Sequence, residues 1–492
     1  MAVRSNKHTN SEQVYYGDFS GGLNLSVPAE ALPKNEMQVA KNFEFDQSTG
    51  APKLRSGLIL MATLPGNIRN LAPVAGANSL LVRCNDNKVY KLSEYTLSGE
   101  LGTVNGNGEL SYAPWGDDDE LVLAAGGKLS LFDGSTVSTV SESLDKNDFV
   151  FVKAGRVACL NKDSDDISYS GVGDITNWQF ASVGETDIWT DADALSLTVG
   201  YKDGCRMVCV APLTSDLMVF KCPQDQPGMG RIYRVTGNYP DWEVADYSTG
   251  SSVCNHASTV TTTNDLLFLT AEGVASLGTV AAYGDIKMQW AGAKVNPRIS
   301  KEMDVANCRM WKMATASQVW VRTKASETVW VYNYGIGSGA WTTFKFPGVV
   351  ADACCVGDSR YIAIGTQVFR MDDTSGTDNG QVFSGQIKMQ GIRKLGMTLI
   401  KQAYIAYDSM ADSIAKLKIE GHEISLPLGG QLNDVAVEDD DIASQDEDPL
   451  LSSTSASVRA RMNIRVWDAT AELEVARGPF KLNAIGLEVA EV

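Results

Sequence analysis

The sequence is dominated by short apolar runs that come in pairs, and a tight polar turn separates the two members of each pair. Gly, Asp, Asn or Ser bounds the runs, and long amphipathic helical patterns are scarce. Turn residues of this kind accept a positive φ or a sharp reversal, so each pair predicts an antiparallel β-hairpin. The predicted hairpins are 79–93, 120–135, 149–161, 266–278, 318–334 and 360–373.

The hairpins recur at intervals of about 30–50 residues, which is the range of repeat lengths in radial and solenoid proteins. The first strand of each hairpin is nearly all apolar, which indicates a strand buried on both faces. We therefore predict an all-β fold built on a β-propeller over residues 65–375, with six or seven blades. A large β-sandwich assembly is the alternative, because the spacing is irregular and no WD-type signature marks the blades.

A different pattern begins after the turn-rich stretch 371–385. In one of the strand-like runs that follow, apolar residues alternate with Arg459, Arg461 and Arg465. Such alternation is typical of an antiparallel strand with one buried and one solvated face. Residues 376–492 are therefore predicted to form a C-terminal antiparallel domain that resembles a β-sandwich and acts as a platform.

An acidic segment, residues 433–449, interrupts this C-terminal domain, and it includes Asp439, Asp440 and Asp441. Its self-repulsion and its few apolar residues favour a solvated loop. The alternative is that the segment binds the arginine face of a neighbouring subunit, because their charges are opposite. Calcium binding is a further alternative for this segment, although it lacks the D-x-D-x-D-G spacing.

Residues 1–64 are predicted to form an N-terminal arm that packs on the C-terminal domain or on a neighbouring subunit. Gly21 and Gly22 indicate close backbone approach or a positive φ, and we interpret them as a flexible joint. They are therefore candidate subunit-contact residues. The apolar spacing that follows predicts one short helix over residues 34–42, before the first strands.

The formal net charge of the 492-residue chain is -18. A strongly acidic surface repels phosphate, which argues against a tight DNA clamp but not against a pore through which DNA slides. No apolar run approaches the roughly 20 residues needed to cross a bilayer, and the N-terminus has no apolar signal core. The nine dispersed cysteines fit reduced thiols in a protein made in a cytoplasm, and their spacing predicts no zinc site.

Catalytic motifs are absent from the sequence: the three histidines fall in no metal or nucleophile motif, and no glycine-rich stretch fits a phosphate loop. We therefore predict no enzymatic activity, no metal and no cofactor. The ten tryptophans and the carboxylates at turns leave a sugar-binding or sugar-cleaving propeller as an alternative. Trp178 and Trp242 lie near turns and are predicted to be the exposed aromatic residues.

Several stretches resemble the tail nozzle, or packaged-DNA stabilisation, proteins of short-tailed bacteriophages. Residues 18–58, which begin DFSGGLNLSVP, resemble the N-terminal segment of that family, and ISYSGVGDITNWQF at 167–180 resembles a second stretch. The longest likeness covers 217–286 and contains NYPDWEV and LLFLTAEGVASLG. FKLNAIGLEV at 480–489 resembles the closing strand of the family.

The resemblance implies a β-propeller tail hub fused to a sheet domain and assembled as a ring, usually a homohexamer. Such rings are made in the host cytoplasm and become part of the virion, where they retain packaged DNA and conduct it during ejection. They dock on portal or adaptor proteins and on tail fibre, needle or plug proteins, and genome DNA passes through the lumen without sequence-specific binding. We therefore expect a structural tail nozzle. A receptor- or carbohydrate-binding tail propeller and a non-viral interaction scaffold are the alternatives.

Overall fold

A computed structural model describes residues 11–491 except 75, 77, 117–118, 181–192, 238–241, 264, 281–284, 338, 393–396, 410–413, 428–453 and 468. Strands dominate it. Its helical elements are α1 (Asn296–Glu302) and the 3-10 turns η1 (Ala29–Ala31), η2 (His256–Ser258) and η3 (Ala314–Ala316). None of the helices in this part of the chain has the length and apolar character to span a membrane.

The chain divides into two compact units, neither of which is continuous in sequence. The sheet unit comprises Met1–Ile59, Trp330–Lys345 and Met371–Val492. The propeller unit comprises Leu60–Val329 and Phe346–Arg370.

The propeller unit is a series of antiparallel sheets whose strands follow one another in chain order. The first sheet consists of β8 (Ile68–Val74), β9 (Ser79–Cys84), β10 (Lys88–Ser93), β11 (Thr96–Leu97) and β12 (Gly102–Thr103). The second consists of β13 (Ser111–Pro114), β14 (Leu121–Ala124), β15 (Ser130–Phe132) and β16 (Val137–Thr139). The third consists of β17 (Phe149–Lys153), β18 (Arg156–Leu160), β19 (Asp166–Tyr169) and β20 (Leu195–Thr198). The next two consist of β21 (Arg206–Leu213), β22 (Asp216–Cys222), β23 (Arg231–Thr236) and β24 (Glu243–Thr249), and of β25 (Thr259–Thr261), β26 (Asp265–Thr270), β27 (Gly273–Val280) and β28 (Asp285–Gln289). The last two begin with β29 (Arg309–Met313), β30 (Gln318–Arg322) and β31 (Thr328–Asn333), and with β33 (Val350–Val356), β34 (Ser359–Ile364) and β35 (Gln367–Asp372).

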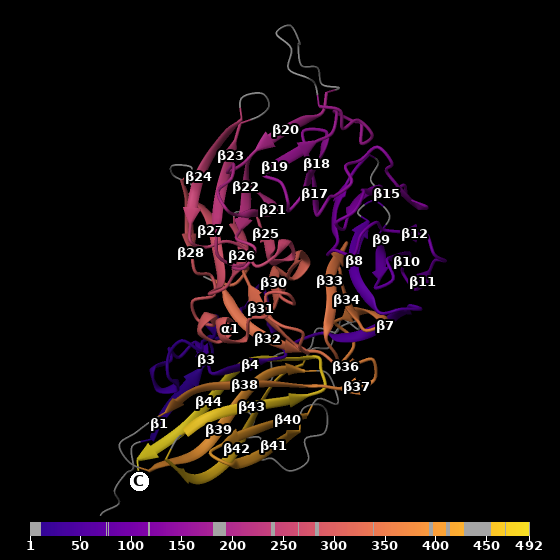
Figure 1. Cartoon of the computed structure of the whole chain (residues 1–492). Coiled ribbons are helices and arrows are strands. Elements are labelled where there is room, and N and C mark those ends of the chain that lie inside the picture. The colour runs from indigo at the N-terminus through magenta and orange to yellow at the C-terminus, as the bar shows by residue number, and fades with distance from the viewer. Residues whose placement is uncertain are drawn as a thin grey trace, which may run out of the picture. The chain divides into compact units, whose positions relative to one another are not determined.

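These sheets are the blades of a β-propeller, arranged radially in Figure 1, and the residues that the structure describes form seven of them. The predicted β-propeller is confirmed. Each of the six predicted hairpins is present, as β9-β10, β14-β15, β17-β18, β26-β27, β30-β31 and β34-β35. Apolar clusters lie between adjacent blades, so the two-sided burial inferred from the apolar first strands is also found.

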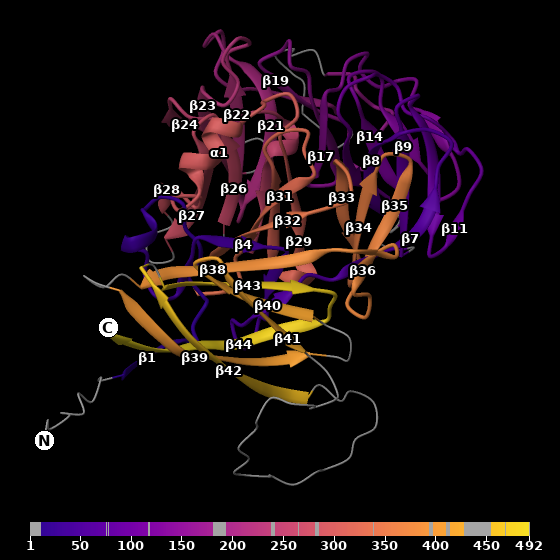
Figure 2. The same ribbon diagram turned by 90° about the horizontal axis from the view of Figure 1, so that it is seen from below.

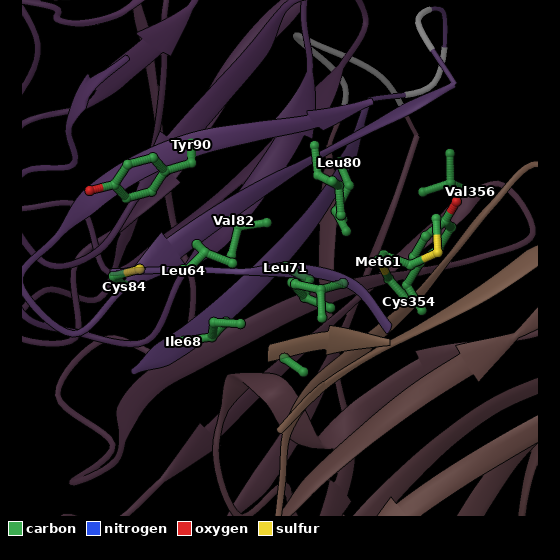
Figure 3. Packing of buried hydrophobic residues seen from close by; sticks show 14 residues of the cluster. Met61, Leu64, Ile68, Leu71, Leu80, Val82, Cys84, Tyr90, Cys354 and Val356 are labelled. Atoms are coloured by element: carbon green, nitrogen blue, oxygen red, sulfur yellow. The ribbon is translucent and has the colours of Figure 1, made fainter. Parts of the chain in front are cut away.

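The seventh blade is completed by β7 (Gly57–Thr63), which precedes the first blade in the sequence and lies next to β35 in the sheet. Met61 of β7 belongs to the same buried cluster as Leu71 of β8 and Cys354 of β33 (Figure 3). The first and last blades are therefore joined by apolar packing, and removing this surface from water stabilises the closed ring.

The sheet unit contains two main sheets. One has the order β42-β39-β44-β6-β5, with β1 also paired to β44, and the other includes the order β32-β4-β38-β43-β40-β41. The first sheet consists of β42 (Thr454–Val466), β39 (Thr398–Ser409), β44 (Phe480–Glu491), β6 (Pro52–Leu54), β5 (Phe43–Phe45) and β1 (Ser11–Tyr16). The second includes β32 (Ala340–Lys345), β4 (Val39–Lys41), β38 (Ser384–Ile392), β43 (Ala469–Ala476), β40 (Ile414–Ile419) and β41 (His422–Pro427). Figure 2 shows β42 at the margin of its sheet, beside β39.

The N-terminal segment is woven into these sheets. β1 pairs with β44 from Ser11 opposite Ala490 to Tyr16 opposite Ile485. The short helix predicted over residues 34–42 is wrong: the chain forms β3 (Glu36–Met37) and β4 instead. β4 bonds to β38 on one side and to β32 on the other, and these tertiary hydrogen bonds replace the local bonds of a helix.

Gly21 and Gly22 are buried within the sheet unit, so the interpretation of a flexible joint is wrong. Gly22 has a φ of +65°, and a Cβ atom placed on it would lie 2.7 Å from the backbone nitrogen of Trp341. At Gly21 a Cβ atom would lie 2.7 Å from the carbonyl oxygen of Asn35. Both glycines therefore allow close backbone approach, as the sequence suggested. Because both are buried, neither has exposed surface for contact with a partner subunit.

Replacing Gly22 should destabilise the sheet unit more than replacing Gly50 does. Gly50 has a φ of +69° but has open space where its Cβ atom would lie, so Gly50→Ala isolates the backbone strain, about 1–2 kcal/mol. Gly22→Ala adds a steric clash with the backbone, which we expect to cost about 1–3 kcal/mol more. Urea unfolding followed by circular dichroism measures both. Equal losses in the two variants would contradict the close approach at Gly22.

Candidate functional site

Three blades carry a buried cation near the end of their second strand. Arg83 of β9, Lys221 of β22 and Arg322 of β30 are 1%, 0% and 5% exposed. Each donates hydrogen bonds to backbone carbonyl oxygens. These acceptors lie either in the segment that connects two neighbouring blades or in the neighbouring blade. The acceptors are Gly106 (2.8 Å) and Gly108 (3.0 Å) for Arg83, Val199 (2.9 Å) and Gly200 (2.8 Å) for Lys221, and Val350 for Arg322.

These cations add buried polar contacts to the apolar packing between blades. A buried charge is costly unless it is hydrogen-bonded, so each cation fixes the position of the carbonyl groups around it. Hairpin periodicity does not identify these residues. The signal for them is a basic residue near the end of an otherwise apolar run, as in SLLVRC, LMVFKC and QVWVRT.

A second buried cluster joins four blades. Arg309, the first residue of β29, pairs through Nη2 with the carboxylate of Glu109, which lies shortly before β13. Its Nη1 atom is 3.6 Å from Oδ1 of Asp352 on β33. The amide of Asn70 on β8 donates to Glu109 at 2.5 Å. Because the second and sixth blades are not neighbours, the Arg309–Glu109 pair bridges the centre of the ring.

Electrostatics supports an ionised Glu109. Burial disfavours its charged form, but the nearby Arg309 guanidinium and the amide of Asn70 together lower the pKa of this carboxyl below its usual value. His256, in η2, lies close by, with its ring 5.9 Å from the ring of Phe149. Burial lowers the pKa of His256 below its usual value, which favours the neutral imidazole in the folded propeller.

Stability of the propeller unit should therefore fall as the pH drops below about 6.5. The unfolded chain protonates His256 near pH 6.5 and the folded chain does so at a lower pH, so the folded state binds fewer protons in between and loses stability on acidification. We expect His256→Gln to reduce the drop in the thermal unfolding midpoint between pH 7.5 and pH 5.5, by an amount equivalent to about 1 kcal/mol. His422→Gln, at an exposed position, is the matched control. An unchanged drop in the His256 variant would contradict the neutral, buried imidazole.

The carboxylates near residue 165 have structural partners. Lys221 pairs with Asp165 at 2.8 Å and with Asp203 at 3.0 Å, while Asp166 accepts a hydrogen bond from Thr198. Asp166 also lines a recess of about 300 Å³ together with Asp145, Lys146 and Ser164. Among the residues that the structure describes, no group of His, Cys, Asp or Glu is arranged to hold a metal ion.

Arg55 is the central charged residue of the sheet unit and is 1% exposed. Its guanidinium donates to both carboxylate oxygens of Asp378, at 2.9 and 2.5 Å, and to the carbonyl oxygen of Lys345 at 2.8 Å. Nε donates to Asn42 at 3.2 Å. The guanidinium carbon lies 3.9 Å from the ring centre of Phe383, a cation–π contact. One side chain thus links three separate parts of the chain that make up this unit.

Removing Arg55 should destabilise the sheet unit strongly. Arg55→Met leaves the Asp378 carboxylate buried without its partner, which we expect to cost about 3–5 kcal/mol of unfolding free energy. The double variant Arg55→Met with Asp378→Leu should recover part of this loss, since no unpaired charge remains. Lys53→Met is the matched control: it removes an exposed ion pair with Asp373 (3.5 Å) and should cost about 0–1 kcal/mol. Similar losses in the Arg55 and Lys53 variants, measured by urea unfolding, would contradict this role.

The two tryptophans predicted to be exposed do not form a free aromatic surface. Trp178 is 6% exposed, and its indole N–H donates to the carbonyl oxygen of Ile175 at 2.6 Å, so the prediction is wrong for this residue. Trp242 is partly buried, and its ring lies 5.0 Å from that of Tyr169. A position near a turn does not predict solvent exposure here, because these turns fold back onto apolar neighbours.

The three candidate arginines are brought together on one face. Arg459, Arg461 and Arg465 lie on the exposed side of β42, opposite Tyr404, Gln402 and Leu399 of β39. The guanidinium carbon of Arg459 is 5.9 Å from the centre of the Tyr404 ring. The prediction of a solvated arginine face is confirmed. The other candidate contact residues, Asp439, Asp440 and Asp441, lie outside the described residues.

No family model matches the sequence, and no curated protein matches it. The fold is similar to that of several solved structures. The structure of U3-55K is 10% identical with a TM-score of 0.42, over 64% of this chain and 98% of that chain. The WD40 β-propeller domain of Doa1 is 12% identical with a TM-score of 0.40, over 64% and 96%. Virginiamycin B lyase from Staphylococcus aureus is 9% identical with a TM-score of 0.42, over 64% and 97%.

Proposed function

We propose that this protein is a structural component of a bacteriophage tail, a nozzle or hub that assembles as a ring, retains packaged DNA and conducts it during ejection. One observation carries the proposal: two stretches that resemble the tail nozzle family, at opposite ends of the chain, pair within one sheet. Lys53 of β6 lies opposite Lys481 of β44, and β6 pairs in turn with β5. A propeller combined with such a sheet unit is the arrangement that the resemblance implies.

The conduit in this proposal is formed by several copies, and not by the propeller of one copy. The Arg309–Glu109 pair crosses the centre of the propeller between blades that are not neighbours. A channel crossed by an ion pair does not admit a DNA duplex. The lumen therefore requires a ring of subunits, and cyclic symmetry is the common way to build one.

The charge of the chain fits passage of DNA better than capture. At a net charge of -18, the protein repels phosphate on average, so DNA would move along its surface without adhering. The sugar-binding alternative rested on tryptophans and on carboxylates at turns, and the buried position of Trp178 removes one of its two candidate exposed tryptophans.

The proposal predicts a closed ring. We expect the purified chain, or the chain mixed with purified portal or adaptor proteins of a phage neck, to give rings in negative-stain images and a mass near six times 53.0 kDa by light scattering. We also expect the protein in purified virions by mass spectrometry. A chain that is absent from virions and stays monomeric at every concentration would refute the proposal.

A further inference from the structure

The outer face of the sheet β42-β39-β44-β1 carries a connected set of arginine, tyrosine and amide side chains. Pairing places Arg459, Tyr404 and Gly486 in one row, and Tyr15 of β1 lies opposite Gly486 at its end. The adjacent row runs from Arg461 through Gln402 and Glu488 to Gln13. We call the exposed residues Arg459, Arg461, Arg465 and Tyr15, together with the partly exposed Tyr404, the basic face.

The basic face is open to solvent. Tyr15 is 62% exposed, the three arginines are exposed, and Tyr404 is partly exposed. Among the described strands, β42 pairs with β39 alone, so its second edge is unpaired there. The apolar residues on the inner side of β42, such as Val458 and Ile464, are only partly buried. A long edge strand with incomplete burial is a surface that a further polypeptide would cover.

Charge identifies the chemistry of that polypeptide. Lys401 and Glu488 lie on the same sheet and form an ion pair at 3.6 Å, and the ion pairs found among the described residues leave the three arginines without a carboxylate. The net charge of the chain is -18, so these three cations form a local patch of positive charge on an acidic protein. Arginine and tyrosine are also the residue types enriched where protein interfaces gain most of their affinity.

The complementary surface is present in the same sequence. Residues 433–449 contain eight Asp or Glu residues and no Lys or Arg. Opposite potentials of this kind steer association and fix the choice of partner. A single exposed ion pair contributes little, but several charges acting together contribute more.

We infer that the basic face of one copy binds the acidic segment 433–449 of the neighbouring copy. This inference rests on the proposed ring and names the contact that holds it together. Two different patches meet in such a contact, which makes it a head-to-tail interface of the kind that closes into a cyclic ring.

The test uses two charge-reversed chains. The face variant is Arg459→Glu with Arg461→Glu and Arg465→Glu. The segment variant changes Asp439, Asp440, Asp441, Asp446, Glu447 and Asp448 to Lys, which turns the net charge of residues 433–449 from -8 to +4. The control variant, Lys146→Glu with Lys162→Glu and Lys312→Glu, makes the same charge change as the face variant at exposed lysines of the propeller unit. Light scattering and negative-stain images report assembly at low and high salt, and circular dichroism confirms that each variant is folded.

We expect each charge-reversed chain alone to need at least about tenfold higher concentration to assemble, and the control to assemble as the unchanged chain does. An equal mixture of the face and segment variants should recover ring assembly. In a ring in which the two variants alternate, the acidic face of each face variant contacts the basic segment of a segment variant. The unchanged basic face of each segment variant contacts the unchanged acidic segment of a face variant.

Other results would overturn the inference. If the mixture fails but one chain carrying both sets of changes assembles, the acidic segment binds the face of its own chain. If the face variant assembles normally but loses affinity for double-stranded DNA, the face binds nucleic acid. If the unchanged chain forms no ring, the proposed function fails; if it forms rings and the face variant does so equally well, only this inference fails.

Discussion

The structure depends on a single physical constraint, that a cation inside a protein must be surrounded by oxygen atoms. Arg55 meets it with Asp378, Asn42 and the carbonyl oxygen of Lys345, and so unites the sheet unit. Arg83 and Lys221 meet it with carbonyl groups between blades. Breaking such a contact leaves a buried charge unpaired, whereas loss of an apolar neighbour leaves only a cavity. These residues therefore determine which parts of the chain lie together.

Hairpin periodicity was sufficient to predict the propeller because each blade is local in sequence. Periodicity alone did not determine the number of blades, because the seventh blade is completed by β7, which lies far from β35 along the chain. The helix predicted over residues 34–42 failed for a related reason. Its apolar spacing suits a helix, but β4 is held by backbone hydrogen bonds to β38 and β32, and Asn42 adopts a φ of 57°. Long-range pairing overrides local preference in such a segment.

Site residues could be predicted where apolar and polar residues alternate along a strand. The exposed arginines of β42 follow directly from the period of two along a strand. Glu109, Arg309 and Asp352 could not be connected from the sequence, because they meet only when the ring of blades closes. Trp178 was misjudged because nearness to a turn says nothing about how the turn packs. Gly22 was recognised as a special backbone position, but its partner, the backbone of Trp341, lies hundreds of residues away.

The discontinuous composition of the sheet unit also sets an order of events during synthesis. Residues up to Ile59 leave the ribosome first, but most of their partners follow Met371. At about 5–20 residues per second, translation of the intervening chain takes roughly 15–60 s. During that interval the strand-forming segment around Phe43 has an exposed edge and apolar side chains, while the propeller blades can already fold one after another. The nascent chain is therefore most exposed to mispairing or chaperone binding at its N-terminal segment, and the last strand to be made, β44, ends that exposure.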